Sequence, residues 1–81
     1  MNLYYVYSIQ SVNNPNRYYI GSTDNISIRL QKHNSGKSSY TSKFKPWQLM
    51  FFIAFPDKQH ALRFEKYLKS GSGRAFIKKH F

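Results

Sequence analysis

Five side chains of this sequence have types and spacings that could hydrolyse a phosphodiester bond. They are two tyrosines, an arginine, a histidine and a glutamate: Tyr7, Tyr19, Arg29, His33 and Glu65. This reaction needs a cation that neutralises the phosphate, a metal that polarises it and a base for the attacking water. Because the set holds only one carboxylate, it argues against a two-metal nuclease, in which several acids hold the ions.

Glu65 is the only glutamate among the three acids of the chain. The segment 57–70 has helical periodicity, and Glu65 lies beside its apolar stripe of Ala61, Leu62, Phe64 and Leu68. A buried carboxylate without a partner costs several kcal/mol, so it needs a divalent metal or a salt bridge. Arg29, Arg63 or a lysine could supply the salt bridge, and both interpretations stay open.

The other four residues also have ordinary structural explanations. Tyrosines are common in strands, Arg29 fits a solvated helix face, and His33 near a helix C-terminus favours the helix dipole. A glycine such as Gly21 often only ends a strand. No single residue is therefore decisive, and the order and spacing of the set are more informative than its types.

The composition points to one small basic domain over residues 1–81. The 13 Lys and Arg against three acids give a net charge of +10, which favours a polyanionic partner, most simply nucleic acid. An anionic membrane surface is the lesser alternative, because no segment combines a basic face with a broad apolar face. Without cysteine, a long apolar run or a secretory signal, we expect a cytoplasmic protein with no disulfide, zinc–thiolate site or membrane span.

The first half of the sequence predicts a hairpin and a helix. Residues 3–9 and 17–21 are rich in β-branched and aromatic side chains, and turn formers separate them. The helix should run through about Asn34, with its N-cap among residues 23–25 and its end near Gly36.

The second half predicts one strand and two helices. The residues of Trp47–Phe55 are apolar at odd and at even positions alike, so both faces of this strand should be covered. We therefore expect a central strand. Asp57 should cap the next helix, residues 70–73 should interrupt it, and residues 74–81 should form a short last helix. The predicted fold is α/β of the α+β kind, a three-stranded antiparallel or mixed sheet flanked by helices in the order β-β-α-β-α-α. We expect the five candidate residues to converge on one side of the sheet.

Residues 37–46 form a basic and irregular segment. The candidates for binding DNA phosphates are Lys32, Lys37, Lys43 and Lys45, together with the lysines of the C-terminal helices. Tyr40 and Phe44 alternate with the lysines of this segment and could stack on exposed bases. The alternative is that Phe44 and Trp47 anchor the segment to the core.

The spacings resemble those of the GIY-YIG nuclease superfamily over nearly the whole chain. Tyr19-Ile20-Gly21 matches the second tripeptide of that family in full. Tyr5-Val6-Tyr7 stands in place of the first, with Tyr5 for Gly and Val6 for Ile. Arg29, His33 and Glu65 follow in the order of the family. The run 19–36, followed by Lys45-Pro46-Trp47, is similar to a small single-domain branch related to the nuclease half of the excision-repair UvrC subunit.

The resemblance implies a metal-dependent DNA endonuclease that uses one Mg²⁺ or Mn²⁺ ion and acts by nicking or by single-strand or structure-selective cleavage. The likeness to UvrC suggests DNA repair, but the sequence leaves the pathway open between repair, a mobile element and DNA uptake. The resemblance also implies that Glu65 binds the metal, that Arg29 stabilises the phosphate, and that Tyr7, Tyr19 or His33 is the base. Gly21 would allow close approach of DNA to the backbone. Many relatives add a DNA-binding module, so a protein partner or a dimer is expected to guide target choice.

Two other functions remain open from the sequence. A non-catalytic nucleic-acid-binding module with the same fold predicts salt-sensitive binding without metal dependence. A basic structural protein bound to RNA or to a protein partner, with Glu65 in an ion pair, predicts that Glu65→Ala destabilises the fold.

Overall fold

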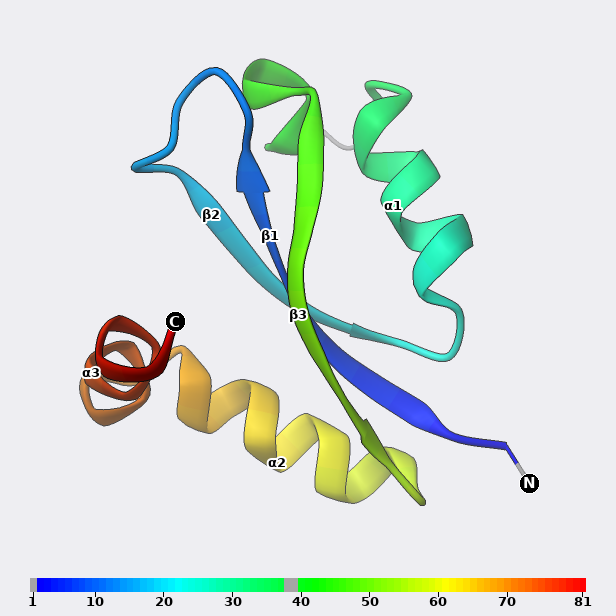
Figure 1. Cartoon of the computed structure of the whole chain (residues 1–81). Helices are drawn as coiled ribbons and strands as arrows, with labels where there is room; N and C mark the ends of the chain where they lie inside the picture. Colours follow the sequence, from blue (N-terminus) through cyan, green and yellow to red (C-terminus); the bar gives the residue numbers. More distant parts are fainter. Residues whose placement is uncertain (1, 38–39) are drawn as a thin grey trace.

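In the computed structural model, which describes residues 2–37 and 40–81, the elements follow the predicted order (Figure 1). They are β1 (Tyr4–Ser11), β2 (Tyr18–Thr23), α1 (Ile26–Asn34), the short 3₁₀ turn η1 (Thr41–Phe44), β3 (Trp47–Phe55), α2 (Lys58–Leu68) and α3 (Gly71–His80). The predicted α+β fold with three strands and three helices is confirmed.

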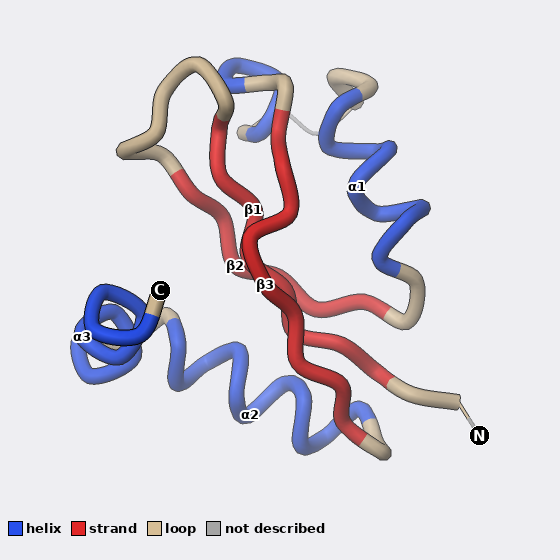
Figure 2. The backbone as a smooth tube through the Cα atoms, in the orientation of Figure 1, coloured by secondary structure: helices blue, strands red, loops and turns tan. Residues whose placement is uncertain are grey.

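The three strands form an antiparallel sheet in the order β2-β1-β3. The pairing of β1 with β2 places Tyr7 opposite Gly21 and Ile9 opposite Tyr19. The strands cross the molecule with a strong twist (Figure 2), the usual behaviour of a small sheet. Strand β2 has one free edge, and this edge is where the candidate residues meet.

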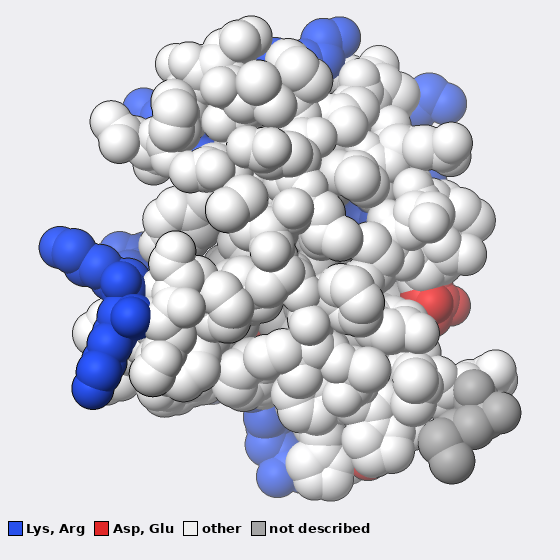
Figure 3. All heavy atoms as spheres, in the orientation of Figure 1, with Lys and Arg blue, Asp and Glu red and all other residues white. Residues whose placement is uncertain are grey.

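The prediction that Trp47–Phe55 is the central strand is wrong, because β1 is central and β3 lies at an edge. Four consecutive residues of β1, Val6 to Ile9, are buried, whereas Leu49, Met50 and Phe52 of β3 are 36% to 52% exposed. Figure 3 shows the molecule in the orientation of Figure 1, and on the side that faces the viewer Lys and Arg lie mostly at the margins. The apolar composition of β3 therefore reflects strand propensity and not a central place in the sheet.

Helices cover both faces of the sheet, α1 on one face and α2 with α3 on the other (Figure 1). Because side chains alternate along a strand, neighbouring residues of β1 contribute to different cores. Val6 packs with Ile20, Ala61 and Leu68 under α2. On the opposite face, Tyr7, Ile9 and Trp47 pack with partly buried residues of α1.

Side-chain caps define where each helix begins. Asn25, Asp57 and Ser70 accept hydrogen bonds from backbone N–H groups in the first turns of α1, α2 and α3, as expected for N-caps. Helix α3 begins at Gly71 and not near residue 74 as predicted, because Gly73 is buried against Tyr67 and Leu68 and so serves close packing. Within α2, Ala61 and Leu68 are buried as predicted, but Leu62 is exposed.

The segment before β3 is anchored by its aromatic residues, as one of the two alternatives predicted. The indole N–H of the buried Trp47 donates to the Thr41 carbonyl oxygen over 2.7 Å. Phe44 packs against the core beneath α1, whereas Tyr40 is exposed. Residues 38 and 39 lie outside the described part of the chain. Among the helices that are described, none is long and apolar enough to cross a membrane.

Candidate active site

Tyr7 and Tyr19 lie side by side on the face of the sheet that α1 covers. Their ring centres are 6.4 Å apart, and the ring of His33, from the last turn of α1, lies 5.9 Å from that of Tyr7 and 5.0 Å from that of Tyr19. The sheet register and the helix therefore bring together three of the five residues that the sequence singled out.

A chain of buried hydrogen bonds runs from Tyr7 through His33 to Thr41. The Tyr7 hydroxyl lies 2.8 Å from His33 Nε2, and His33 Nδ1 lies 3.0 Å from Thr41 Oγ1. Tyr7 is 2% exposed and His33 is 3% exposed. When the Nδ1–H of a neutral His33 donates to Thr41, its Nε2 accepts the proton of Tyr7.

Burial keeps both groups of this chain neutral. Burial raises the pKa of Tyr7 to about 12, although the positive charge of Arg29 acts in the opposite direction. Burial, and then the charge of Arg29, lower the pKa of His33 below its ordinary value of 6.5. At neutral pH the pair therefore consists of a phenol and an uncharged imidazole.

Gly21 makes room for the hydroxyl of Tyr7. A Cβ atom at this position would lie 2.5 Å from Tyr7 Oη and 3.0 Å from a ring carbon of Tyr19. The buried glycine thus has a packing role, which the spacing of the tripeptide did not indicate. Contact between Gly21 and DNA stays a prediction.

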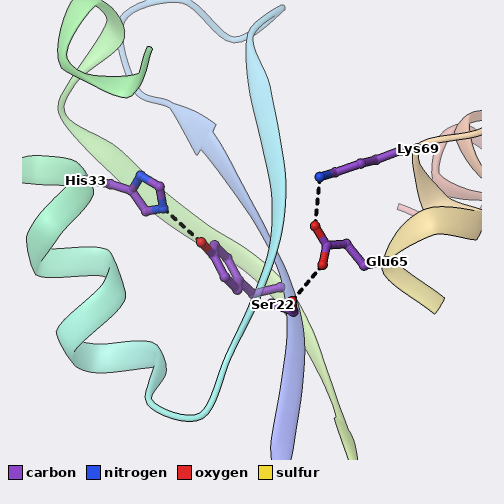
Figure 4. A network of polar contacts seen from close by, with 5 residues as sticks. Ser22, His33, Glu65 and Lys69 are labelled. Atoms are coloured by element: carbon purple, nitrogen blue, oxygen red, sulfur yellow. Dashed lines mark hydrogen bonds and ion pairs between the residues drawn. The ribbon is translucent and has the colours of Figure 1, made fainter. Parts of the chain in front are cut away.

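Glu65 is held by two hydrogen bonds at the edge of the sheet (Figure 4). Ser22 Oγ donates to Oε1 over 2.6 Å, and Lys69 Nζ donates to Oε2 over 2.7 Å. Burial alone would raise the pKa of the Glu65 carboxyl, but these bonds and the charges of Lys69 and Arg29 outweigh it and lower the pKa. The side chain is 17% exposed and ionised at neutral pH.

The expectation that all five residues converge on one side of the sheet is wrong. His33 reaches from α1 and Glu65 from α2, on opposite sides of β2 (Figure 4). The two halves meet around the free edge of β2, where Tyr19 and Ser22 project to different faces. Arg29 lines a cavity together with Tyr19 and His33. Its positive charge acts on the pKa of Tyr7, His33 and Glu65.

Two of the four predicted DNA-binding lysines before β3 belong to this site. Lys32 and Lys37 line a small cavity together with Tyr19, Arg29 and His33. Lys43 and Lys45 lie in and just after η1, are exposed and do not line this cavity. Their contact with DNA stays a prediction.

The carboxylate of Glu65 is a suitable ligand for a single Mg²⁺ or Mn²⁺ ion. In the described part of the chain, no three His, Cys, Asp or Glu residues are grouped so as to hold a metal. Mg²⁺ does not need such a group, because it keeps several waters and binds through one or two carboxylates and the phosphates of a substrate. Lys69 occupies Oε2 and would have to move for an ion to bind there.

Of the partners of the candidate residues, the lysine that was one expected salt-bridge partner of Glu65 is Lys69, which lies four residues later on the same helical face. Two other partners were not found from the sequence. Ser22 becomes visible only when it is known which face of β2 lies under α2. Thr41 carries no signal in a segment without regular periodicity.

Comparisons with known proteins identify sequences and a solved structure that are similar to this chain. The family model described as the GIY-YIG catalytic domain matches residues 3–79. Structure-specific endonuclease subunit SLX1 of Debaryomyces hansenii is 41% identical over 73 residues, which cover 82% of this chain and 21% of that protein. The chain thus spans about a fifth of the length of that relative.

A second relative is similar to this chain in size, and its structure has been solved. UPF0213 protein BH0048 of Halalkalibacterium halodurans is 36% identical over 72 residues, which cover 88% of this chain and 74% of that protein. The solution NMR structure of UPF0213 protein BH0048 from Bacillus halodurans matches with a TM-score of 0.55 and 31% identity, over 95% of this chain and 83% of that one.

Proposed function

This chain belongs to the GIY-YIG family, and from that premise we propose that it is an endonuclease that hydrolyses DNA phosphodiester bonds with one Mg²⁺ or Mn²⁺ ion. The observation that carries the proposal is the arrangement around β2. Two tyrosines and a histidine lie on one side, where Arg29 lines a cavity with Tyr19 and His33, and a single ionised carboxylate lies on the other.

Arg29 supplies the positive charge that a phosphodiester requires. Its guanidinium is planar and always protonated, so it can bind two phosphate oxygens and stabilise the charge that grows on them. Lys32 and Lys37 line the same cavity and hold neighbouring phosphates.

Tyr19 is the best-placed residue to orient and deprotonate the attacking water. It is half-buried and lines the cavity with Arg29, whereas the hydroxyl of Tyr7 is buried and bonded to His33. A phenol needs help from a neighbouring group to act as a base, and Arg29 in the same cavity is the candidate for that role. The rings of Tyr7 and His33 lie beside the ring of Tyr19 and hold it in place.

Glu65 is the residue that would hold the metal ion. When bound, a divalent ion polarises the phosphate and stabilises the leaving group. Ser22 keeps the carboxylate pointed toward the edge of β2, and Lys69 balances its charge when no ion is present.

A cleavage assay tests this function. The protein is incubated with labelled single-stranded, duplex and branched DNA in Mg²⁺, in Mn²⁺ and in EDTA. We expect cleavage only with a metal and expect Glu65→Gln to lower the rate by about a hundredfold or more, the effect of losing one group that stabilises transition-state charge. Asp24→Asn is the control, because it also removes one negative charge but Asp24 is exposed and lies outside the site.

The alternative, a non-catalytic nucleic-acid-binding module, makes the opposite prediction. No substrate would be cleaved, and salt-sensitive binding would be the same with metal and with EDTA. The described site favours the enzyme, because a binding module has no need of an ionised carboxylate beside the phosphate-binding cations.

We further propose that a protein partner or a second copy of the chain selects the target. SLX1 of Debaryomyces hansenii is described as an endonuclease subunit, and this chain covers only 21% of it. One active site makes one nick per visit, so cleavage of both strands of a duplex would need two copies.

A further inference from the structure

A second groove adjoins the candidate active site on the other side of Tyr19. The groove has a volume of about 480 Å³ and lies between the start of β2 and the junction of α2 with α3. Residues important for its chemistry are Arg17, Tyr18, Tyr40, Lys69 and Arg74, together with Tyr19. None of the DNA contacts predicted from the sequence includes Arg17 or Arg74.

The groove is positively charged, with three cations and no acid in its lining. Among the residues that the structure describes, the ion pairs are those of Asp57 with His60 and of Glu65 with Lys69. Arg17 and Arg74 thus have no acidic partner there, and Arg17 lies 4.9 Å from the ring centre of Phe44. Two guanidinium groups without acidic partners are suited to bind phosphate groups, because each can donate two parallel hydrogen bonds.

The groove also presents aromatic rings to solvent. Tyr18 is 41% exposed and Tyr40 is 46% exposed. The ring centre of Tyr40 lies 6.1 Å from that of Tyr19 and 6.0 Å from that of Phe44, so both rings are its neighbours. Exposed rings beside cations bind the bases of single strands by stacking. Bases in a duplex are already paired and stacked, so a base that reaches Tyr40 must be unpaired.

The groove and the cavity of Arg29 and His33 are neighbours, because Tyr19 lines both of them. We propose that the groove is a second DNA subsite, which holds unpaired nucleotides beside the cleavage position. Their phosphates bind Arg17, Lys69 and Arg74, and one base packs against Tyr40. The proposal rests on the proposed function only for the statement that the bound strand is the one that is cut.

Lys69 connects the groove to the chemistry. It lines the groove, donates to Glu65 over 2.7 Å and lies 6.0 Å from the ring centre of Tyr19. A phosphate in the groove competes with Glu65 for the ammonium group. Binding of the strand therefore leaves the carboxylate freer to hold a metal ion.

Binding measurements in EDTA test the groove without any cleavage. Fluorescence anisotropy compares a labelled single strand of thymidines with a duplex of equal length, for the wild type and for Tyr40→Ala, Tyr40→Phe and Arg74→Gln. We expect Tyr40→Ala to weaken single-strand binding at least about fivefold and Tyr40→Phe to leave it unchanged, because stacking on one ring contributes ~1 kcal/mol or more. Arg74→Gln should weaken it and reduce its salt dependence. The matched control is Arg63→Gln, an exposed α2 arginine that does not line the groove.

The outcomes separate this proposal from the proposed function. Equal effects of Tyr40→Ala on single strand and duplex, or no effect on either, would overturn the subsite, even if the wild type cleaves DNA with metal. A selective effect of Tyr40→Ala together with no cleavage of any substrate would support the subsite and overturn the nuclease. A loss in Arg63→Gln as large as that in Arg74→Gln would also overturn the subsite, because general charge would then explain the binding.

Discussion

His33 is enclosed by groups from four different elements. Tyr7 comes from β1, Tyr19 from β2 and Thr41 from η1, while Arg29 precedes it by one turn on α1. A proton added to His33 would bring a second positive charge next to Arg29 and abolish the acceptor for the Tyr7 hydroxyl. The enclosure therefore favours the neutral imidazole and makes this residue sensitive to acid.

The stability of the protein should fall between pH 7 and pH 5 because of His33. Its pKa is lower in the folded protein than the ordinary 6.5, so the unfolded chain takes up the proton first as the pH falls. The slope for one such group is at most ~1.4 kcal/mol per pH unit. Urea unfolding midpoints at pH 7, 6 and 5 measure it, and His33→Gln should lose this part of the slope.

The control for this prediction is His80→Gln, which removes an exposed histidine and should keep the slope. Glu65 and Asp57, whose pKa values are lowered, stabilise the fold at neutral pH and lose this effect only as the pH falls below about 4.5. A wild-type slope that survives in His33→Gln would show that other groups cause it.

At the scale of elements, the sequence predicted the type and order of every strand and α-helix because their signals are local, whereas the short 3₁₀ turn η1 was not predicted. N-caps, turn formers and periodicity act over a few residues, and the caps at Asp57 and within residues 23–25 lie where expected. The position of a strand within the sheet is not a local property of its sequence. It depends on which edge β3 joins after α1, and the apolar composition of Trp47–Phe55 does not encode that choice.

The same distinction applies to the candidate site. The sequence shows the order of the five candidate residues, Tyr7, Tyr19, Arg29, His33 and Glu65. It does not show on which face of the sheet each of them lies. The sequence gives no rule for which helix covers which side, so a site on one face seemed the simplest arrangement. The observed site instead surrounds the edge strand β2, and its bonds to Ser22 and Thr41 follow from that placement.

Two glycines on different elements should respond oppositely to replacement by alanine. At Gly21 in β2 a Cβ would press against the hydroxyl of Tyr7, whereas at Gly71 in α3 nothing lies within 4 Å of it. We expect Gly21→Ala to lower the free energy of unfolding by about 1–3 kcal/mol through overpacking. Gly71→Ala should be neutral or raise it by up to ~1 kcal/mol through helix propensity.

Chemical denaturation followed by circular dichroism measures both glycine variants under the same conditions. A Gly21→Ala variant as stable as the wild type would mean that the Tyr7 phenol does not need the space that the glycine leaves. Equal losses in both variants would instead indicate a general effect of removing glycine.

At the scale of the whole molecule, the positive charges far outnumber the negative charges that could pair with them. Three acids can neutralise at most three of the 13 Lys and Arg side chains. In the described residues, Asp57 pairs with a histidine and Glu65 with Lys69. The remaining cations favour binding to any polyanion, but only those that line a cavity at the edge of β2 are positioned beside the candidate chemistry.

Lys37 should therefore contribute to DNA binding in a way that Lys79 does not. Lys37 lines the cavity with Arg29 and His33, whereas Lys79 lies in the last turn of α3 and lines neither cavity. A cation that contacts a phosphate adds about 0.7–0.9 to the slope of log affinity against log salt. Titrations in EDTA at several KCl concentrations should show this loss in Lys37→Gln and an unchanged slope in Lys79→Gln. Equal losses in both variants would mean that DNA senses the net charge of +10 as a whole, and the edge of β2 would then have no special part in binding.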